Sequence, residues 1–218
     1  MKVVIYGLGK HAQMVHYLFT HDSPDEVVAF CVDAAYMPAD NGQFCGLPVV
    51  SFEDLPAHFP TTDYVLHIAI GQVKGRRRVY EAAKARGYSF ASYISSKAQT
   101  WPDLVVGEHV FIDPICSIHP CVTVGDNTML LGVILGHHTY TGSHSTISAC
   151  IIGGGVTIGD GTFVGMGTVI NENLAIGSNN IIGSGCLLAR STADNAVFSA
   201  PATKPRAIDA NRIAMFRR

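Results

Sequence analysis

A six-residue repeat fills most of the second half of the chain and constrains its fold more than any other feature. On this repeat an aliphatic residue recurs, and a small or turn-forming residue often follows it, as Gly159 follows Ile158. The aliphatic positions are Val106, Ile112, Ile118, Val124, Leu130, Ile147, Ile152, Ile158, Val164, Ile170, Ile176, Ile182 and Leu188. A hexapeptide period is typical of a parallel β-helix, in which each unit is one short strand and a turn and three units close a triangular coil. We therefore predict stacked coils that bury this aliphatic column.

The composition fits a folded protein with a substantial core. The chain has 218 residues, of which 48% are hydrophobic, enough for one large or two small domains. The formal net charge of -2 argues against nucleic acid or an anionic membrane as the main partner. The chain has no run of about 18 apolar residues, and it begins with a strand and a glycine turn rather than a signal peptide. We expect a cytoplasmic protein.

The six cysteines lack Cys-x-x-Cys spacing, so we expect mostly buried thiols and no metal site.

The first part of the chain follows a different pattern from the repeat. Apolar runs at 2–6, 27–32 and 64–70 indicate buried strands, and amphipathic stretches after residue 9 and at 73–85 indicate helices. Strands that alternate with helices imply a small parallel sheet. We therefore predict a Rossmann-like α/β half at 1–93, a linker at 94–103, a β-helix at 104–203 and a C-terminal tail at 204–218.

A glycine-rich turn joins the first strand to the first helix. The run Gly7–Ala12 satisfies the spacing Gly-x-Gly-x-x-Ala, and Asp33 follows about twenty residues later, which is the context of a dinucleotide-binding fingerprint. Backbone N–H groups at the start of a helix favour a phosphate. The first part of the chain has room for only half of a dinucleotide fold, so a mononucleotide or a nucleotide-sugar diphosphate fits better. A tight turn that binds nothing is the structural alternative.

The repeat is interrupted where histidines gather. One residue is missing between Leu130 and Leu135 and another between Ile147 and Ile152. His137 and His138 lie between these two interruptions, and Thr141 takes a column position that is aliphatic elsewhere. Departures from a local pattern are expected at functional sites. Three other polar groups are expected to be solvated, namely His109, His119 and the helix face of Arg76–Arg78.

Four segments resemble one family. Val4–Gly7 with His11, Ile68–Gly71, Leu135–His138 and Ala200–Ala202 are similar to motifs of the left-handed β-helix sugar acyltransferases. The branch is that of the sialic acid O-acetyltransferases and the bacterial N-acetyltransferases that act on nucleotide-linked 4-amino sugars. The resemblance covers nearly the whole chain. It implies a left-handed β-helix, a homotrimer, and acetyl-CoA in the groove between neighbouring β-helices.

The same resemblance implies roles for individual residues. His137 would be the general base, His138 stands where family members frequently have a carboxylate, and His144 is the nearest counterpart of a second histidine that contacts the thioester carbonyl. The residues expected near acetyl-CoA are Gly154, Met166, Ser184 and Pro201. The residues expected near a sugar nucleotide in the N-terminal domain are Gly7, Gly9, His11, Asp33 and Gly71.

Histidine suits acyl transfer because a neutral imidazole can take the proton of an attacking amine or hydroxyl. Side chains alternate along a strand, so we expect His137 to point outward into the groove and His138 inward. We do not expect His138 to orient His137 as a carboxylate would.

The acceptor stays open between a hydroxyl, as in sialic acid O-acetylation, and the amine of a nucleotide-linked 4-amino-deoxysugar. The resemblance of the Gly-His-His run to the N-acetyltransferase branch favours the amine. The basic residues of the tail would either cover part of CoA or form a frayed or docked end; they are Lys204, Arg206, Arg212, Arg217 and Arg218.

Three other functions fit the sequence less well. A zinc lyase similar to γ-class carbonic anhydrase needs two histidines separated by four residues, whereas six residues separate His137 from His144. A non-catalytic trimeric scaffold would not require the glycine–histidine run. Chemistry that depends on NAD is disfavoured by the size of the N-terminal part.

Overall fold

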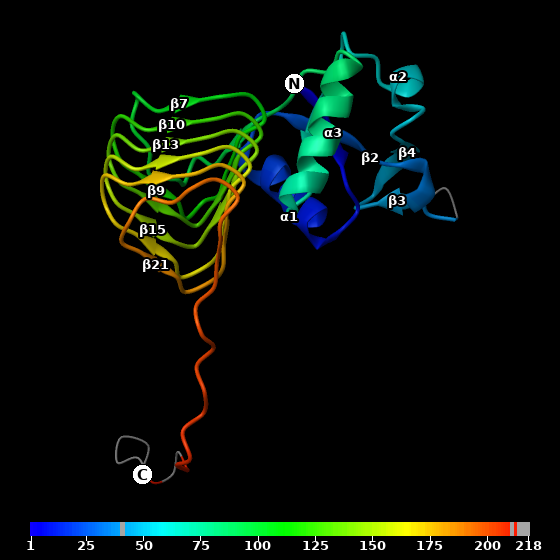
Figure 1. Ribbon diagram of the computed structural model, residues 1–218. Helices are drawn as coiled ribbons and strands as arrows, with labels where there is room; N and C mark the ends of the chain where they lie inside the picture. Colours follow the sequence, from blue (N-terminus) through cyan, green and yellow to red (C-terminus); the bar gives the residue numbers. More distant parts are fainter. Residues whose placement is uncertain (40–41, 210–211, 213–218) are drawn as a thin grey trace.

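The computed structural model describes residues 1–39, 42–209 and 212 and contains two units, a small α/β unit and a triangular prism of stacked coils (Figure 1). The prediction of an α/β half followed by a parallel β-helix of hexapeptide repeats is confirmed. After the last coil the chain leaves the prism as an extended tail. Two of the predicted basic tail residues, Arg217 and Arg218, lie outside the described residues.

The N-terminal unit is built on a five-stranded sheet. Its strands are β1 (Lys2–Tyr6), β2 (Glu26–Val32), β3 (Gln43–Phe44), β4 (Leu47–Ser51) and β5 (Tyr64–Ile68), in the order β3-β4-β2-β1-β5. All neighbours run parallel except β3, which pairs antiparallel with β4. The carboxyl ends of β1, β2 and β5 therefore meet at one edge, and the glycine turn lies there.

Helices cover both faces of this sheet. They are α1 (Lys10–Asp22), η1 (Ala34–Tyr36), α2 (Leu55–His58) and α3 (Val73–Ala85). The helix α1 buries Val15 and Phe19 in one core cluster, whereas α3 buries Val79 and Ala83 in the cluster on the opposite face. Because side chains of β1 alternate between the two faces, a continuous apolar strand serves both cores.

The prism has three faces, and each is a sheet of parallel strands. Each face is named after its first strand beyond residue 100. The β7 face holds β7 (Val105–Val106), β10 (Thr123–Val124), β13 (Tyr140–Thr141), β16 (Thr157–Ile158) and β19 (Ala175–Ile176). The β8 face holds β6 (Tyr93–Ile94), β8 (Phe111–Ile112), β11 (Met129–Leu131), β14 (Thr146–Ser148), β17 (Phe163–Val164), β20 (Ile181–Ile182) and β22 (Val197–Phe198). The β9 face holds β9 (Ser117–Ile118), β12 (Ile134–Leu135), β15 (Ile151–Ile152), β18 (Val169–Ile170) and β21 (Leu187–Leu188).

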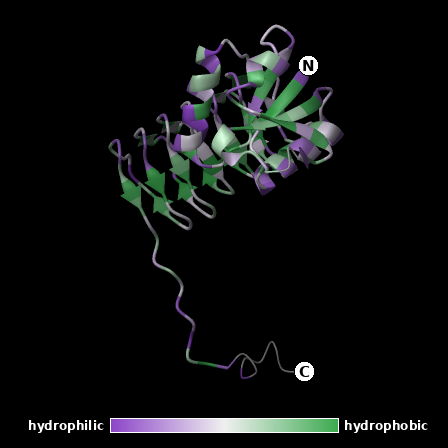
Figure 2. Cartoon of the chain, turned by 90° about the vertical axis from the view of Figure 1, so that its right-hand side faces the viewer, coloured by the Kyte–Doolittle hydropathy of each residue, from purple (hydrophilic) through white to green (hydrophobic). Residues whose placement is uncertain are grey.

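The aliphatic column of the repeat fills the prism, as predicted. Every predicted position is buried except Val106, which packs against the core at its edge. Thr141 takes its column place between Val124 and Ile158 and is fully buried, and its Oγ1 has no hydrogen-bond partner. The strands of the prism are green, and therefore hydrophobic, in Figure 2.

The two interruptions of the repeat fall at corners and leave strand register intact. Two residues separate β11 from β12 and β14 from β15, whereas four separate β17 from β18. We call these the shortened corners; they contain Gly132 and Ala149, both with positive φ. Both lie where the chain passes from the β8 face to the β9 face, so the missing residues shorten the edge of the prism without disturbing its core.

The N-terminal unit packs on the β8 face. Its strand β6 pairs with β8, and Phe111 and Met129 of the prism join the core cluster of α1. Residue 93 thus pairs with a prism strand, and the predicted boundary between 1–93 and the linker stays a prediction.

Arg76 of α3 is the main polar contact between the two units. Its side chain is fully buried, and it donates hydrogen bonds to Asn127 O at 3.2 Å, Ser145 O at 2.8 Å and Thr146 Oγ1 at 2.9 Å in the prism. It also donates to Ile70 O at 3.1 Å in its own unit. Burial lowers the pKa of Arg76 to about 10, so the guanidinium stays charged at neutral pH. The expectation of a solvated helix face is wrong for Arg76, because carbonyl groups of the prism satisfy its charge.

His109 is also buried at this interface, contrary to the expectation that it is solvated. Its Nε2 accepts the N–H of Ile68 at 2.7 Å, and its Nδ1 lies 2.7 Å from Asn127 Oδ1. Burial lowers the pKa of His109 well below that of a solvated imidazole. His67 lies beside it, with ring centroids 4.8 Å apart, and burial lowers the pKa of His67 to about 4. Both histidines are therefore neutral parts of the packing.

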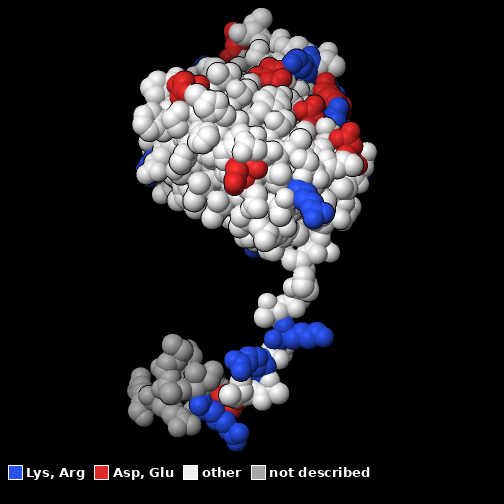
Figure 3. All heavy atoms as spheres, turned by 60° about the vertical axis from the view of Figure 1, so that its left-hand side comes forward, with Lys and Arg blue, Asp and Glu red and all other residues white. Residues whose placement is uncertain are grey.

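Charged side chains are sparse on the side of the molecule seen in Figure 3, and Lys and Arg stand out along the tail. Within the described part of the chain, none of the helices combines the length and apolarity needed to cross a bilayer.

Candidate functional site

His137 and His138 form a turn at the corner between the β9 and β7 faces. Both side chains are exposed, and His138 has a φ of 58°. The prediction that one histidine points outward and the other inward is wrong, because neither residue belongs to a strand and the alternation of a strand does not apply to a corner. Both imidazoles are therefore accessible at the edge of the prism.

The two imidazoles are hydrogen-bonded to each other. Nδ1 of His137 lies 3.1 Å from Nδ1 of His138, and the rings are nearly perpendicular at 87°. One nitrogen must donate and the other accept, so the pair shares a single N–H···N contact. The expectation that His138 does not orient His137 as a carboxylate would stays a prediction, although the two rings are in hydrogen-bond contact. Nε2 of His137 is the nitrogen that this contact leaves free.

Gly154, one coil further along, provides the surface on which the His137 ring lies. A Cβ at residue 154 would lie 2.8 Å from both Cε1 and Nε2 of His137. The backbone N–H of Gly155 donates to the carbonyl of His137 at 2.8 Å. The missing side chain at 154 therefore determines where the imidazole sits. That Gly154 also contacts acetyl-CoA stays a prediction.

A carboxylate that the sequence analysis missed lies at the same corner. Asp103 Oδ2 accepts the backbone N–H of Cys121 at 2.6 Å, and that hydrogen bond lowers the pKa of Asp103. His138 in turn donates its backbone N–H to Pro120 O at 3.1 Å. Asp103, Cys121 and His138 are successive neighbours down this edge of the prism.

His144 does not join the histidine pair within one chain. It lies at the corner between the β7 and β8 faces, where its Nδ1 accepts Asn127 Nδ2 at 2.8 Å and its ring packs edge-on against Tyr80. Six residues after His138 correspond to one hexapeptide, so His144 is one corner further along the coil. Within one chain His144 therefore contributes to the contact between the two units, and its predicted role at the thioester carbonyl stays a prediction.

The remaining predicted acetyl-CoA contacts lie across the β9 face from the histidine pair. Met166 and Ser184 belong to the corner between the β8 and β9 faces, where Gly185 N donates to Met166 O at 2.8 Å. Pro201 is exposed in the extended tail. The predicted positions thus flank the β9 face from two corners.

The outer side of the β9 face is apolar and exposed. Ile134, Ile151, Val169 and Leu187 follow one another down this face with exposures of 43%, 51%, 37% and 69%. Exposed apolar strips of this kind are typical of surfaces that contact another molecule.

A cleft of about 360 Å³ lies at the carboxyl edge of the N-terminal sheet and contains Gly7, Gly9 and Asp33. Gly7 has a φ of 124°, and a Cβ there would lie 3.1 Å from the carbonyl oxygen of Ala69, so glycine suits this turn. Arg78 closes one side through an ion pair of 2.7 Å with Asp33. The structure therefore brings three of the five residues predicted to bind a sugar nucleotide into one cleft.

The other two predicted residues lie outside this cleft's lining. His11 faces the prism, where its ring packs against Phe111 and its buried Nε2 has no hydrogen-bond partner. Burial lowers the pKa of His11, with a further contribution from the charge of Arg76. Gly71 lines a second, larger cavity.

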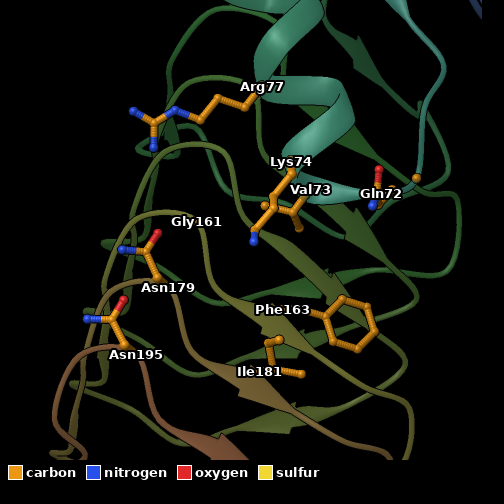
Figure 4. A pocket seen from close by; sticks show the side chains of 10 residues that line it. Gln72, Val73, Lys74, Arg77, Gly161, Phe163, Asn179, Ile181 and Asn195 are labelled. Carbon is orange, nitrogen blue, oxygen red and sulfur yellow. The ribbon is translucent and has the colours of Figure 1, made fainter.

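That larger cavity, of about 810 Å³, lies between the start of α3 and the later coils of the prism (Figure 4). Lys74 and Arg77 extend from α3, and Phe163 and Ile181 form the apolar side on the β8 face. Among the described residues, no group of three His, Cys, Asp or Glu side chains is arranged to hold a metal ion.

Two family models match separate parts of the chain. Residues 2–83 match the PglD N-terminal domain, and residues 155–190 match the bacterial transferase hexapeptide (six repeats). A search of curated proteins found no match.

Solved structures match almost the whole chain. A perosamine N-acetyltransferase from Caulobacter crescentus, in complex with CoA and GDP-perosamine, is 26% identical with a TM-score of 0.81, covering 90% of this chain and 92% of its own. The acetyltransferase domain of PglB from Neisseria gonorrhoeae is 18% identical with a TM-score of 0.79, covering 90% and 95%. WeeI from Acinetobacter baumannii is 19% identical with a TM-score of 0.72, covering 90% and 96%. The two less identical structures support the fold alone.

Proposed function

We propose that this chain is a left-handed β-helix sugar acyltransferase with a PglD-type N-terminal domain, and that it transfers an acetyl group from acetyl-CoA to the amine of a nucleotide-linked 4-amino-deoxysugar. The observation that carries this proposal is the similarity over 90% of the chain to an N-acetyltransferase that binds CoA and GDP-perosamine. The histidine pair supports it independently, because it exposes a base at the edge of the prism.

His137 acts as the general base in this mechanism. Its Nε2 takes a proton from the amine as the amine nitrogen attacks the thioester carbonyl, so the new C–N bond forms as the amine is deprotonated. The tetrahedral species then collapses, the C–S bond breaks, and CoA leaves as its thiol after taking up the proton. The transfer is direct and forms no covalent intermediate with the enzyme.

The acceptor binds at the carboxyl edge of the N-terminal sheet. The cleft at Gly7 and Gly9 opens at the start of α1, where free backbone N–H groups favour a diphosphate. Arg78, at the side of this cleft, adds a positive charge, and Asp33 is placed to accept a hydrogen bond from a ribose or sugar hydroxyl.

A homotrimer brings acceptor and base together. The N-terminal unit covers the β8 face, whereas His137 lies at the opposite corner of the triangle, between the β9 and β7 faces. A sugar held by one chain therefore meets His137 of a neighbouring chain. The apolar β9 face is the surface that such an assembly buries, and the corners that flank it, with Gly154 on one side and Met166 and Ser184 on the other, form the groove for acetyl-CoA.

The test is acetyl transfer from acetyl-CoA to a panel of UDP-, dTDP- and GDP-linked amino sugars and free sialic acids, read by product mass. We expect an N-acetylated nucleotide sugar with the wild type and at least a 10²-fold lower turnover with His137→Ala, the usual size of a general-base effect. His119→Ala is the matched control, because this exposed histidine lies one coil above on the same edge.

Two outcomes would change the proposal. A product only with free sialic acids would replace N-acetyl transfer with O-acetyl transfer. Turnover of His137→Ala within threefold of the wild type would remove His137 as the base.

A further inference from the structure

We propose that Trp101 binds the sugar ring of the acceptor, which packs on its indole while the amine of the sugar faces His137. The cleft at Gly7 and Gly9 takes the diphosphate of the nucleotide sugar, so the sugar ring itself needs a second binding surface. This inference deepens the proposed function and rests on it.

Trp101 is exposed at the wall of a cleft in the first coils of the prism. It is the single tryptophan of the chain and is 56% exposed, although tryptophan is highly buried on average. The cleft has a volume of about 510 Å³, and its wall includes Gln99, Thr100, Ser117 and Pro120. Clefts that bind small molecules have volumes in this range, and an aromatic wall with a few polar groups is their usual lining.

This cleft adjoins the histidine pair. Pro120 lies in its wall and accepts the backbone N–H of His138 at 3.1 Å. The lower wall of the cleft and the histidine pair therefore belong to adjacent coils, and strands of adjacent coils are about 4.8 Å apart. Trp101 itself lies two residues before Asp103, the carboxylate on the same edge of the prism. A ring in this cleft is thus next to the imidazoles.

Donor and acceptor then reach the base from opposite ends of the prism. The residues proposed for the acetyl-CoA groove all follow His137 along the coils, whereas Trp101 precedes it. The N-terminal unit packs on the first coils, where Phe111 and Met129 join its core. In the proposed trimer the first coils of neighbouring chains stand side by side. The nucleotide held by one chain therefore presents its sugar beside Trp101 of the next.

The chemistry of the cleft fits an uncharged sugar ring better than a phosphate. Among the described residues that line it, none is a lysine or an arginine. A diphosphate, or the 3′-phosphate of CoA, would find no positive charge in this lining. A pyranose has C–H groups on its faces and hydroxyls around its edge. One face can pack on the indole, and the hydroxyls suit the amide of Gln99 and the hydroxyls of Thr100 and Ser117.

The first test is the fluorescence of the single tryptophan, which reports contact at Trp101 without depending on turnover. Each UDP-, dTDP- and GDP-linked amino sugar of the panel is titrated into the full chain. The matching nucleoside diphosphate and CoA serve as controls that lack the sugar. We expect an amino sugar, and neither control, to shift the emission and to protect the indole from quenching by acrylamide.

Three results would overturn this assignment. An equal change with the nucleoside diphosphate would assign the indole to the nucleobase. Protection already present in the ligand-free protein would place the indole in a contact between chains. Binding of an amino sugar in calorimetry without a change at the indole would refute this inference alone, whereas absence of binding by every sugar of the panel would refute the proposed function.

The second test is kinetic and separates the two substrates. Trp101→Ala should raise the KM for the acceptor about tenfold and leave kcat and the KM for acetyl-CoA unchanged, because the indole contacts the acceptor alone. Trp101→Phe keeps an aromatic face and should stay within about threefold of the wild type. Tyr17→Ala is the matched control, since Tyr17 is an aromatic residue of α1 with a similar exposure of 60%. An unchanged acceptor KM in Trp101→Ala, or an equal rise in Trp101→Phe, would refute the packing of a sugar on this ring.

Discussion

Replacing Arg76 with methionine should loosen the contact between the N-terminal unit and the prism without unfolding the coils. Arg76→Met keeps most of the aliphatic stem but removes the guanidinium. Carbonyl groups on both sides then lose a donor, namely those of Asn127 at 3.2 Å and Ile70 at 3.1 Å, whereas Ser145 O loses the guanidinium at 2.8 Å but keeps the N–H of Met129 at 3.0 Å. Because the contacts to Asn127 and Ser145 are buried, water does not replace the lost donor there.

The magnitude follows from two opposing effects. Each buried carbonyl left without a donor costs about 1–3 kcal/mol, and further contacts of Arg76 reach Gly71 O at 3.2 Å and Thr146 Oγ1 at 2.9 Å. Methionine, however, does not bury a charge, and that relief offsets part of the loss. We expect a net decrease of about 3–5 kcal/mol in the free energy of unfolding. For a chain of this length each 1 kcal/mol corresponds to roughly 2–4 °C in the thermal midpoint.

The assay is thermal denaturation followed by circular dichroism, at one fixed protein concentration because association shifts the midpoint. Arg77→Met is the matched control: Arg77 is the next residue of α3, half-exposed, and bonded only to Glu81 within the same helix at 2.7 Å. Such a surface pair contributes about 0.3–0.5 kcal/mol. Hydrogen exchange should additionally show lost protection at Asn127 and Ser145 in Arg76→Met alone.

One result would refute this reasoning. If Arg76→Met shifts the midpoint no more than Arg77→Met does, the guanidinium contributes no net stability, and the desolvation of its charge cancels all of its hydrogen bonds. Arg76→Lys keeps the positive charge but loses the planar guanidinium, and an ammonium cannot reach so many acceptors in different directions. We expect it to fall between the wild type and Arg76→Met.

Three further predictions concern the prism and its interface. Gly154→Ala should lower kcat at least tenfold with little change in the thermal midpoint, because a Cβ would lie 2.8 Å from the His137 ring; unchanged turnover would show that the ring can sit elsewhere. Thr141→Val should raise the free energy of unfolding by about 1 kcal/mol, since the buried Oγ1 has no partner, and a lower midpoint in thermal denaturation would contradict this. Burial lowers the pKa of His67 to about 4 and that of His109 well below the usual value, so below about pH 6.5 the unfolded chain binds more protons. Urea denaturation between pH 6.5 and 5 should show stability falling by roughly 1.4 kcal/mol per unit for each histidine, with a shallower slope in His67→Gln.

The sequence predicted the architecture because the prism depends on local periodicity. A single aliphatic column determines which side chains enter the core, so its positions could be read without knowing any distant contact. Thr141 was recognised for the same reason. The α/β alternation before residue 93 is also local, and it predicted the parallel strands and the edge where Gly7 and Asp33 meet.

The errors concern contacts between distant parts of the chain. Arg76 and His109 were expected on the surface, but Arg76 bonds to residues 51 to 70 positions away and His109 to a residue 41 positions away. No local pattern reports such partners. His144 lies one corner further along the coil than His138 because each hexapeptide advances the chain by one corner, so proximity in sequence is not proximity in the prism.

Asp103 was missed for a related but avoidable reason. Coils here take 17 or 18 residues, as the pairing of Thr123 with Tyr140 and of Thr157 with Ala175 shows. Asp103 precedes Cys121 by 18 residues and accepts its N–H, and Cys121 precedes His138 by 17. Counting whole coils backward from the histidine pair would have found the carboxylate.

The shortened corners have a structural consequence in the proposed trimer. A three-fold rotation about an axis parallel to the prism moves no atom along that axis, so each corner faces its neighbour at its own height. With the β9 faces turned inward, the corner that carries His137 approaches the neighbour's corner between the β8 and β9 faces, where Gly132 and Ala149 mark the missing residues. In the proposed trimer the two shortened corners would therefore stand opposite the base, where each lacks two of the residues that a full corner carries.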